Sequence, residues 1–201
     1  GRSYGRAHKG RVRMQGREVD VSSVQKAIAA GLSYVTEDRK ALGLVLEEPI
    51  VKNISLANLA GVALRGVIDK RREARVAEDY RKALAIRTPG VQQKVLNLSG
   101  GNQQKVVLSK WLFTDPQVLI LDEPTRGIDV GAKYEIYTIM NDLAAQGRGV
   151  VMISSEMPEL LGMCDRIYVM NEGRIVGELS RAEASQERIM ALILQSEGKA
   201  A

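Results

Sequence analysis

Cysteine and histidine are nearly absent from this chain of 201 residues, which contains one of each. A single thiol, Cys164, cannot form an internal disulfide or supply a cluster of thiolate metal ligands, so we expect it to be a small packed residue. Long hydrophobic runs are also missing, since the longest span about five residues and a membrane-spanning helix needs about 20. No charged, apolar and small-residue pattern of a secretory signal opens the chain.

The phosphate-binding pattern GxxxxGK followed by serine or threonine does not occur in this sequence either. Without the backbone N–H groups and the lysine of such a loop, the β- and γ-phosphates of a nucleotide have no cradle on this chain. The first residue is Gly1 and not methionine, so we expect a fragment of a longer protein. The length nevertheless suffices for a single domain, residues 1–201, with a substantial core.

Charge is only mildly unbalanced, with 29 basic and 24 acidic residues and a pI near 9.4. Six basic residues precede the first acid, Glu18, but Tyr4 is the only aromatic residue among them. A second basic run, Lys70 to Arg75, is interrupted by Glu73. A module that binds nucleic acid or anionic lipid through the basic start stays an alternative, but this pattern favours a solvated face and no nucleic-acid partner.

Two adjacent acids follow a short hydrophobic run in the middle of the chain. Residues 118–121, VLIL, lie between Pro116 and Pro124, which is typical of a parallel strand buried on both faces. Asp122 and Glu123 then stand at its carboxyl end, where ligands bind in open α/β sheets. A hard Mg²⁺ ion prefers such oxygen ligands, so we assign Asp122 to the metal. Glu123 is expected to orient or deprotonate an attacking water.

A serine and two glycines precede an amphipathic pattern at residues 98–112. Val107, Leu108 and Trp111 recur at helical spacing, so a helix is expected to begin at Ser99, Gly100 and Gly101. Its first N–H groups lack intrahelical partners, and together with the Ser99 hydroxyl they can hold a phosphate that approaches the glycines closely. An ordinary serine N-cap is the simpler alternative.

The remaining pattern alternates between strands and helices. We expect a hairpin at residues 12–19, a strand at 32–35, a loop at 36–48, and mainly helices over 41–113, including one that Asp69 caps. Beyond the acid pair, a helix around Ile136 and Met140 and a strand at 150–153 favour a parallel sheet. Strands at 166–170 and 174–179 follow, and Ser180 with Glu183 has capping-box spacing before the last helix.

Together these segments resemble the nucleotide-binding domain of ATP-binding cassette (ABC) transporters. SGGNQQK at 99–105, EPTRGIDVGAK at 123–133 and SSEMPELLG at 154–162 are most similar to the C-terminal half of the tandem ATPase subunit of bacterial monosaccharide importers of the ribose, galactose and xylose type. YVTEDRK at 34–40 extends the match. The resemblance implies an α/β fold of the P-loop NTPase type, with a mainly parallel core (1–40 and 114–201), a helical subdomain (41–113) and truncation before the phosphate loop.

The resemblance also implies roles for single residues. LSGG would be the signature motif, with Ser99, Gly100, Gly101 and Gln103 binding ATP that a partner domain holds, and Asp129 would lie at the dimer seam or cap its helix. Glu37 and Ser155 occupy positions where the family usually has glutamine and histidine. Serine cannot titrate near neutral pH as imidazole can, so we expect the chain's own ATP and Mg²⁺ site, with Asp122 and Glu123, to be degenerate.

The function implied is that of the ATPase subunit of a sugar importer, which contributes its signature loop to the competent site of a second nucleotide-binding half of the same polypeptide. Its other partners would be membrane permease subunits and, indirectly, a periplasmic sugar-binding protein, and its location the cytoplasmic face of the bacterial inner membrane. The isolated fragment would be inactive and would expose strand edges. A non-transport ABC ATPase of DNA repair or translation is the second interpretation, but no long heptad run precedes the signature.

Overall fold

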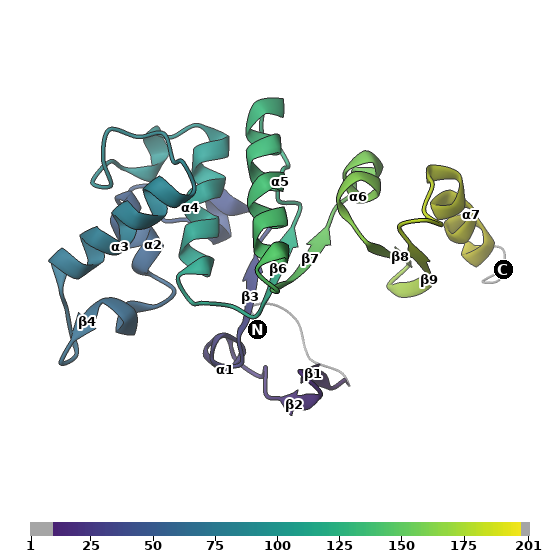
Figure 1. Ribbon diagram of the computed structural model, residues 1–201, viewed down its shortest axis with the longest axis horizontal. Coiled ribbons are helices and arrows are strands. Elements are labelled where there is room, and N and C mark those ends of the chain that lie inside the picture. Colours follow the sequence, from purple (N-terminus) through teal and green to yellow (C-terminus); the bar gives the residue numbers. More distant parts are fainter. Residues whose placement is uncertain (1–9, 198–201) are drawn as a thin grey trace. The chain divides into compact units, whose positions relative to one another are not determined.

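The computed structural model describes residues 10–197, which form two compact units divided after Ile153 (Figure 1). The first unit opens with the expected hairpin, β1 (Val12–Met14) and β2 (Arg17–Val19), whose turn places Gln15 and Gly16 at positive φ. Helix α1 (Val24–Ala29) follows, and the side chain of Ser23 caps it by accepting a hydrogen bond from the Lys26 N–H. The prediction of a hairpin is confirmed.

A parallel sheet of three strands forms the centre of this unit. Its order is β3 (Leu32–Val35), β6 (Val118–Asp122) and β7 (Gly149–Ile153), so β6 is the middle strand. Leu119 and Leu121 of β6 are fully buried, as expected for a strand covered on both faces. Val151 and Ile153 of β7 are 48% and 47% exposed, and β7 pairs only with β6 among the described strands. Among the described strands, β3 and β7 therefore each have one unpaired edge. That another copy or a neighbouring segment covers such edges stays a prediction.

The region between β3 and β6 is dominated by helices, as predicted. It contains two short strands and six helical segments: η1 (Arg39–Gly43), α2 (Ile50–Ser55), η2 (Leu59–Val62), β4 (Ala63–Leu64), β5 (Val67–Ile68), α3 (Lys70–Ala83), η3 (Val95–Asn97) and α4 (Gly100–Leu112). Asp69 caps α3, as predicted. The expected loop at 36–48 was wrong in part, because Asp38 accepts hydrogen bonds from the Lys40 and Ala41 N–H groups and so starts the π-helical turn η1.

Helix α5 (Val130–Ala145) connects β6 to β7 and contacts both α4 and β7. Its inward face carries Ile136, Met140 and Leu143, which are buried. Because α4 contacts α5 and β3, the turn that begins α4 lies near the loop that begins α5. This packing brings together two loops that are about 30 residues apart in the sequence.

The second unit contains α6 (Met157–Met163), an antiparallel hairpin of β8 (Arg166–Asn171) and β9 (Arg174–Ser180), and α7 (Gln186–Glu197). Its small core consists of Ile167, Val169, Leu179 and Ile189. Glu183 accepts a hydrogen bond from the Ser180 N–H, as the capping-box spacing predicted, but α7 begins six residues after Ser180 and not directly behind it. Ser185, whose hydroxyl accepts from the Arg188 N–H, stands before that start instead.

None of the helices within residues 10–197 combines the length and the hydropathy that crossing a membrane requires.

Candidate functional site

The acid pair stands at the carboxyl end of the middle strand of the sheet. Asp122 ends β6, and Glu123 follows with a φ of 46°, in the left-handed region that side-chain-bearing residues rarely adopt. The Glu123 N–H donates to the Ile153 carbonyl at 2.8 Å, which continues the pairing with β7 for one more residue. Backbone conformations of this kind cost energy and often occur at functional sites. The chain therefore turns sharply at the position predicted to be catalytic.

Tyr34 on the neighbouring strand fixes the predicted metal residue. Its hydroxyl donates a 2.5 Å hydrogen bond to Asp122 Oδ2. Partial burial, and then this bond to the carboxylate, raise the pKa of Tyr34 to about 12, so the hydroxyl stays protonated as a donor near neutral pH. Sequence reasoning missed Tyr34, although its strand places successive side chains on opposite faces and Tyr34 stands two residues before the loop at 36–40.

The loop after β3 is tied to the loop after β6. Glu37 forms an ion pair with Arg126, and the Arg39 guanidinium donates to the Arg126 carbonyl at 3.0 Å. These side chains, with Asp38 and Lys40, line an open cavity of about 400 Å³. Glu37 therefore faces a cation in this structure. That ion pair offsets the negative charge that glutamate adds where the family usually has a neutral amide.

The signature turn is a capped helix start. The Ser99 hydroxyl accepts a hydrogen bond from the Asn102 N–H at 3.4 Å and from the Asn102 side-chain amide at 2.9 Å. The Arg87 N–H donates to Asn102 Oδ1 at 2.8 Å and so joins the preceding loop to the turn. The simpler alternative of an N-cap is thus present in the structure, and it leaves the Ser99 oxygen at the first turn of α4.

Close packing within the chain explains Gly101, whereas the neighbour of Gly100 is the movable end of the Arg39 side chain. A Cβ atom on Gly100 would lie 2.8 Å from Arg39 Nη2, and one on Gly101 would lie 2.4 Å from the Ala132 Cβ. Real Cβ atoms do not approach other atoms this closely, so a side chain at Gly101 would push α4 away from α5. The sequence-based argument gave these glycines only the role of admitting an anion.

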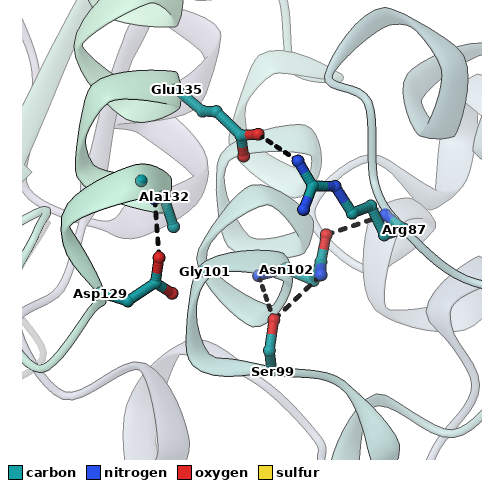
Figure 2. A pocket seen from close by; sticks show the side chains of 8 residues that line it. Arg87, Ser99, Gly101, Asn102, Asp129, Ala132 and Glu135 are labelled. Carbon is teal, nitrogen blue, oxygen red and sulfur yellow. Dashed lines mark hydrogen bonds and ion pairs between the residues drawn. The ribbon is translucent and has the colours of Figure 1, made fainter.

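Figure 2 shows a cavity of about 130 Å³ that begins at this turn and extends to α5. We call it the signature cavity, and it is lined by Arg87, Ser99, Gly101, Asn102, Asp129, Gly131, Ala132 and Glu135. Asp129 caps α5, since its Oδ1 accepts from the Ala132 N–H at 3.0 Å. The predicted seam residue therefore lies with the predicted signature residues in a single cavity.

A network of charges supports one wall of the signature cavity. Lys105, whose side chain is only 2% exposed, lies 2.7 Å from Glu135 and donates to the Ala85 carbonyl at 3.0 Å. Arg87 contacts the other carboxylate oxygen of Glu135 at 2.8 Å. The hydrogen bond from Lys105 is the main cause that lowers the pKa of Glu135, so this carboxylate stays ionised. Glu135 thereby links α5 to both ends of the segment that carries the signature.

Gln103, which we predicted to bind ATP, points away from the signature cavity. It is buried, and its amide donates to the Val95 and Leu98 carbonyls at 3.4 and 3.2 Å. Asn102 lines the cavity instead. Helical periodicity does not separate the two residues, because every position from 103 to 110 is buried; the hydrogen bonds of Gln103 to the Val95 and Leu98 carbonyls do.

The structure does not bring all the predicted site residues together. Ser99, Gly101 and Asp129 line the signature cavity, with Gly100 beside Arg39, whereas Asp122 and Glu123 end β6 and Glu37 lines the other cavity. Ser155 belongs to the second unit. Residues 10–197 contain no group of three carboxylate, thiol or imidazole side chains that could enclose a metal. The pair at β6 still fits Mg²⁺, which is commonly bound by one or two carboxylates together with phosphates.

Comparison with known proteins places these features in a family. Residues 4–126 match the ABC transporter family, which is more than half of the chain. The L-arabinose transport ATP-binding protein AraG of Geobacillus stearothermophilus is 60% identical over 98% of this chain and 38% of its own length. The ribose import ATP-binding protein RbsA of Bacillus subtilis is 50% identical over 93% of this chain and 38% of its own. The chain thus spans less than two-fifths of these relatives.

Solved structures agree with the fold. A dimeric ATP-binding cassette in a post-hydrolysis state bound to ADP and Pi superimposes with a TM-score of 0.70, at 19% identity, over 86% of this chain and 74% of the other. The match concerns the fold alone, because identity is low. With the signature turn before α4, the acid pair after β6, and relatives that match almost all of this chain, we conclude that the chain belongs to the ABC transporter ATP-binding family.

Proposed function

We propose that this chain is part of the ATPase subunit of a bacterial sugar importer and contributes its signature turn to an ATP site that a second nucleotide-binding half of the same polypeptide holds. The signature cavity is the observation that carries the proposal, because it gathers Ser99, Asn102 and Asp129 at the starts of α4 and α5. Relatives named for arabinose and ribose transport support a sugar as the transported substrate. The chain covers 38% of the length of each, which supports a tandem arrangement.

The geometry suggests what each group does. The Ser99 hydroxyl and the first N–H groups of α4 point to a place where phosphate oxygens of a facing nucleotide can bind, with the helix dipole adding to their attraction. Asn102 orients the Ser99 hydroxyl and presents a polar side chain beside it. Arg87 and Glu135 hold this arrangement against α5. The signature turn is therefore preorganised for an anion before a partner arrives.

The acid pair belongs to a second site, in which Asp122 would hold Mg²⁺ and Glu123 would orient the attacking water and accept its proton. Bound Mg²⁺ supplies charge for the phosphates there. In this proposal the second site is the weaker one, because Glu37 is paired with Arg126 and serine stands at position 155. Permease subunits would contact the protein at the cytoplasmic face of the inner membrane, and a periplasmic sugar-binding protein would act through them.

ATPase turnover of the intact tandem protein tests the assignment. We expect Ser99→Ala to lower turnover by about tenfold or more, because a donor to the developing phosphate charge is lost. Glu123→Gln should lower it less. Ser109→Ala is the matched control, since Ser109 lies on the helix that Ser99 caps and its hydroxyl donates to the Lys105 carbonyl, within that helix.

Two results would overturn the division into two sites. Either Glu123→Gln reduces turnover as much as Ser99→Ala does, or Ser99→Ala behaves as Ser109→Ala. Because Ser99 caps α4, its loss also costs about 1 kcal/mol of stability. Urea unfolding of each variant, with Ser99→Thr as a variant that keeps the cap, separates this cost from the effect on turnover.

A further inference from the structure

The hairpin of β4 and β5 presents an apolar tip at the outer end of the helical region, away from the parallel sheet (Figure 1). Arg65 and Gly66 form its two-residue turn, with φ of 52° and 82°, the conformation of a type I′ turn. Leu64 lies directly opposite Val67 in the ladder, so both side chains project on the same face. The hairpin is anchored by Val62, which is fully buried and whose carbonyl accepts from the Asp69 N–H.

Three neighbouring aliphatic side chains on this hairpin face solvent. Leu64 is 64% exposed and Val67 71%, and Ile68 is also exposed. Single exposed aliphatic residues are ordinary on protein surfaces. Leu64 and Val67 instead form an exposed apolar pair on one face of the ladder, whereas Ile68, opposite Ala63, lies on the other face. Adjacent exposed aliphatic side chains of this kind are typical of an interaction surface.

Basic residues surround this tip and outnumber the acidic residues there. Arg65 lies in the turn, and the first turns of α3 add Lys70, Arg71, Arg72 and Arg75, all exposed. None of these five forms an ion pair within the described part of the chain.

The two nearby carboxylates accept hydrogen bonds from backbone N–H and hydroxyl groups. Asp69 accepts from the Arg71 and Arg72 N–H groups as the cap of α3, and Glu73 accepts from the Ser55 hydroxyl at 2.6 Å. The surface around the tip therefore combines exposed aliphatic carbon with an excess of positive charge.

We infer that this surface, the β4–β5 tip with the first turns of α3, binds the headgroup region of an anionic lipid bilayer directly. Aliphatic side chains insert into the boundary between headgroups and acyl chains, and lysine and arginine gain free energy from the negative surface potential. Charge complementarity decides this occupant, because the five cationic side chains around the tip outnumber the two carboxylates, Asp69 and Glu73. The inference concerns contact with lipid itself and does not depend on ATP or on a permease.

Co-sedimentation of the protein with lipid vesicles tests the inference. We expect binding to vesicles of phosphatidylglycerol and phosphatidylcholine, weakening as salt is added, and little binding to phosphatidylcholine alone. Arg71→Gln with Arg72→Gln should weaken binding by about fivefold for each cation removed. Leu64→Ser with Val67→Ser should weaken it by about tenfold or more, and this loss should persist at high salt.

Arg174→Gln with Ile175→Ser is the matched control on the β8–β9 hairpin, where Ile175 is 63% exposed. Thermal unfolding checks that every variant stays folded. Equal binding of wild type and the Leu64, Val67 variant would overturn the inference, as would binding only to vesicles that contain the permease subunits. The first outcome would mean that the aliphatic side chains do not contact the bilayer. The second would mean that this surface binds a protein and not lipid.

Discussion

The signature turn and the acid pair of this chain are built in different ways. Around the signature turn, Ser99, Asn102, Arg87, Glu135 and Lys105 form a continuous series of hydrogen bonds and ion pairs that ends in a buried ammonium group. At the acid pair, Asp122 is held by a single exposed tyrosine, next to an edge strand. The shape of the signature turn therefore follows from packing within the chain, so substitutions in this network should lower stability strongly. Substitutions at the acid pair should affect the chemistry more than the stability.

The largest expected loss follows from removing the charge of Glu135. Glu135→Gln leaves Lys105 buried without a counter-ion, which costs about 3–5 kcal/mol in buried pairs. We expect the lower end of that range, because the Glu135 side chain is 35% exposed. Urea unfolding measures this loss, and Lys105→Met added to Glu135→Gln should restore part of it because the unpaired charge is gone.

Glu48→Gln is the matched control for this prediction. It breaks the Lys52–Glu48 pair, which is equally short but exposed on both sides, and it should cost about 1 kcal/mol or less. If the two substitutions cost the same, the signature turn is no more dependent on its charges than the surface is. The contrast drawn between the two regions would then fail.

A second buried cation on α4 makes the stability of the signature helix depend on pH. Burial lowers the pKa of Lys110 to about 8, whereas an unfolded lysine titrates near 10.5. Between these values the unfolded chain binds more protons, so stability should rise as pH rises from 8 toward 10.5, by at most about 3 kcal/mol. Unfolding measured between pH 8 and 9, below the tyrosine pKa near 10, should show the start of this rise in wild type and lose it in Lys110→Met.

Lys40→Met, which removes an exposed lysine, should leave the pH profile as it is in wild type. A flat wild-type profile over this interval would contradict the prediction. It would mean that Lys110, whose ammonium donates to the Gly43 carbonyl, keeps its proton in both states.

Local chemistry explains which parts of the fold could be predicted from the sequence. Strands β3 and β6 follow from short apolar runs, and the starts of α1, α3 and α4 follow from Ser23, Asp69 and Ser99, whose side chains cap the next turn. These signals lie within a few residues of the structure that they produce. The same applies to the signature serine and the acid pair, which stand directly beside their elements.

Contacts between distant segments could not be predicted in this way. The packing of Gly101 against Ala132, the bond from Tyr34 to Asp122 and the place of Arg39 beside Gly100 all join segments that are at least 30 residues apart. The exchange of Gln103 for Asn102 as the cavity residue depends on packing too, here against the nearby η3, which decides which of the two amides faces outward. A motif match indicates which residue types belong to a site, but packing decides where each side chain points.

The smallest expected loss of stability concerns the acid pair, and it tests the same comparison between the two regions. Tyr34→Phe removes the hydrogen bond to Asp122 and should cost about 1 kcal/mol or less, because both partners reach water. Tyr168→Phe is its matched control, as Tyr168 on β8 is similarly exposed and no hydrogen bond of its hydroxyl is found in residues 10–197. In urea unfolding, the Tyr34→Phe variant should be slightly less stable than Tyr168→Phe and clearly more stable than Glu135→Gln. A loss as large as that of Glu135→Gln would mean that the acid pair, too, is held by the packing of the chain, and the two regions would then differ in chemistry but not in construction.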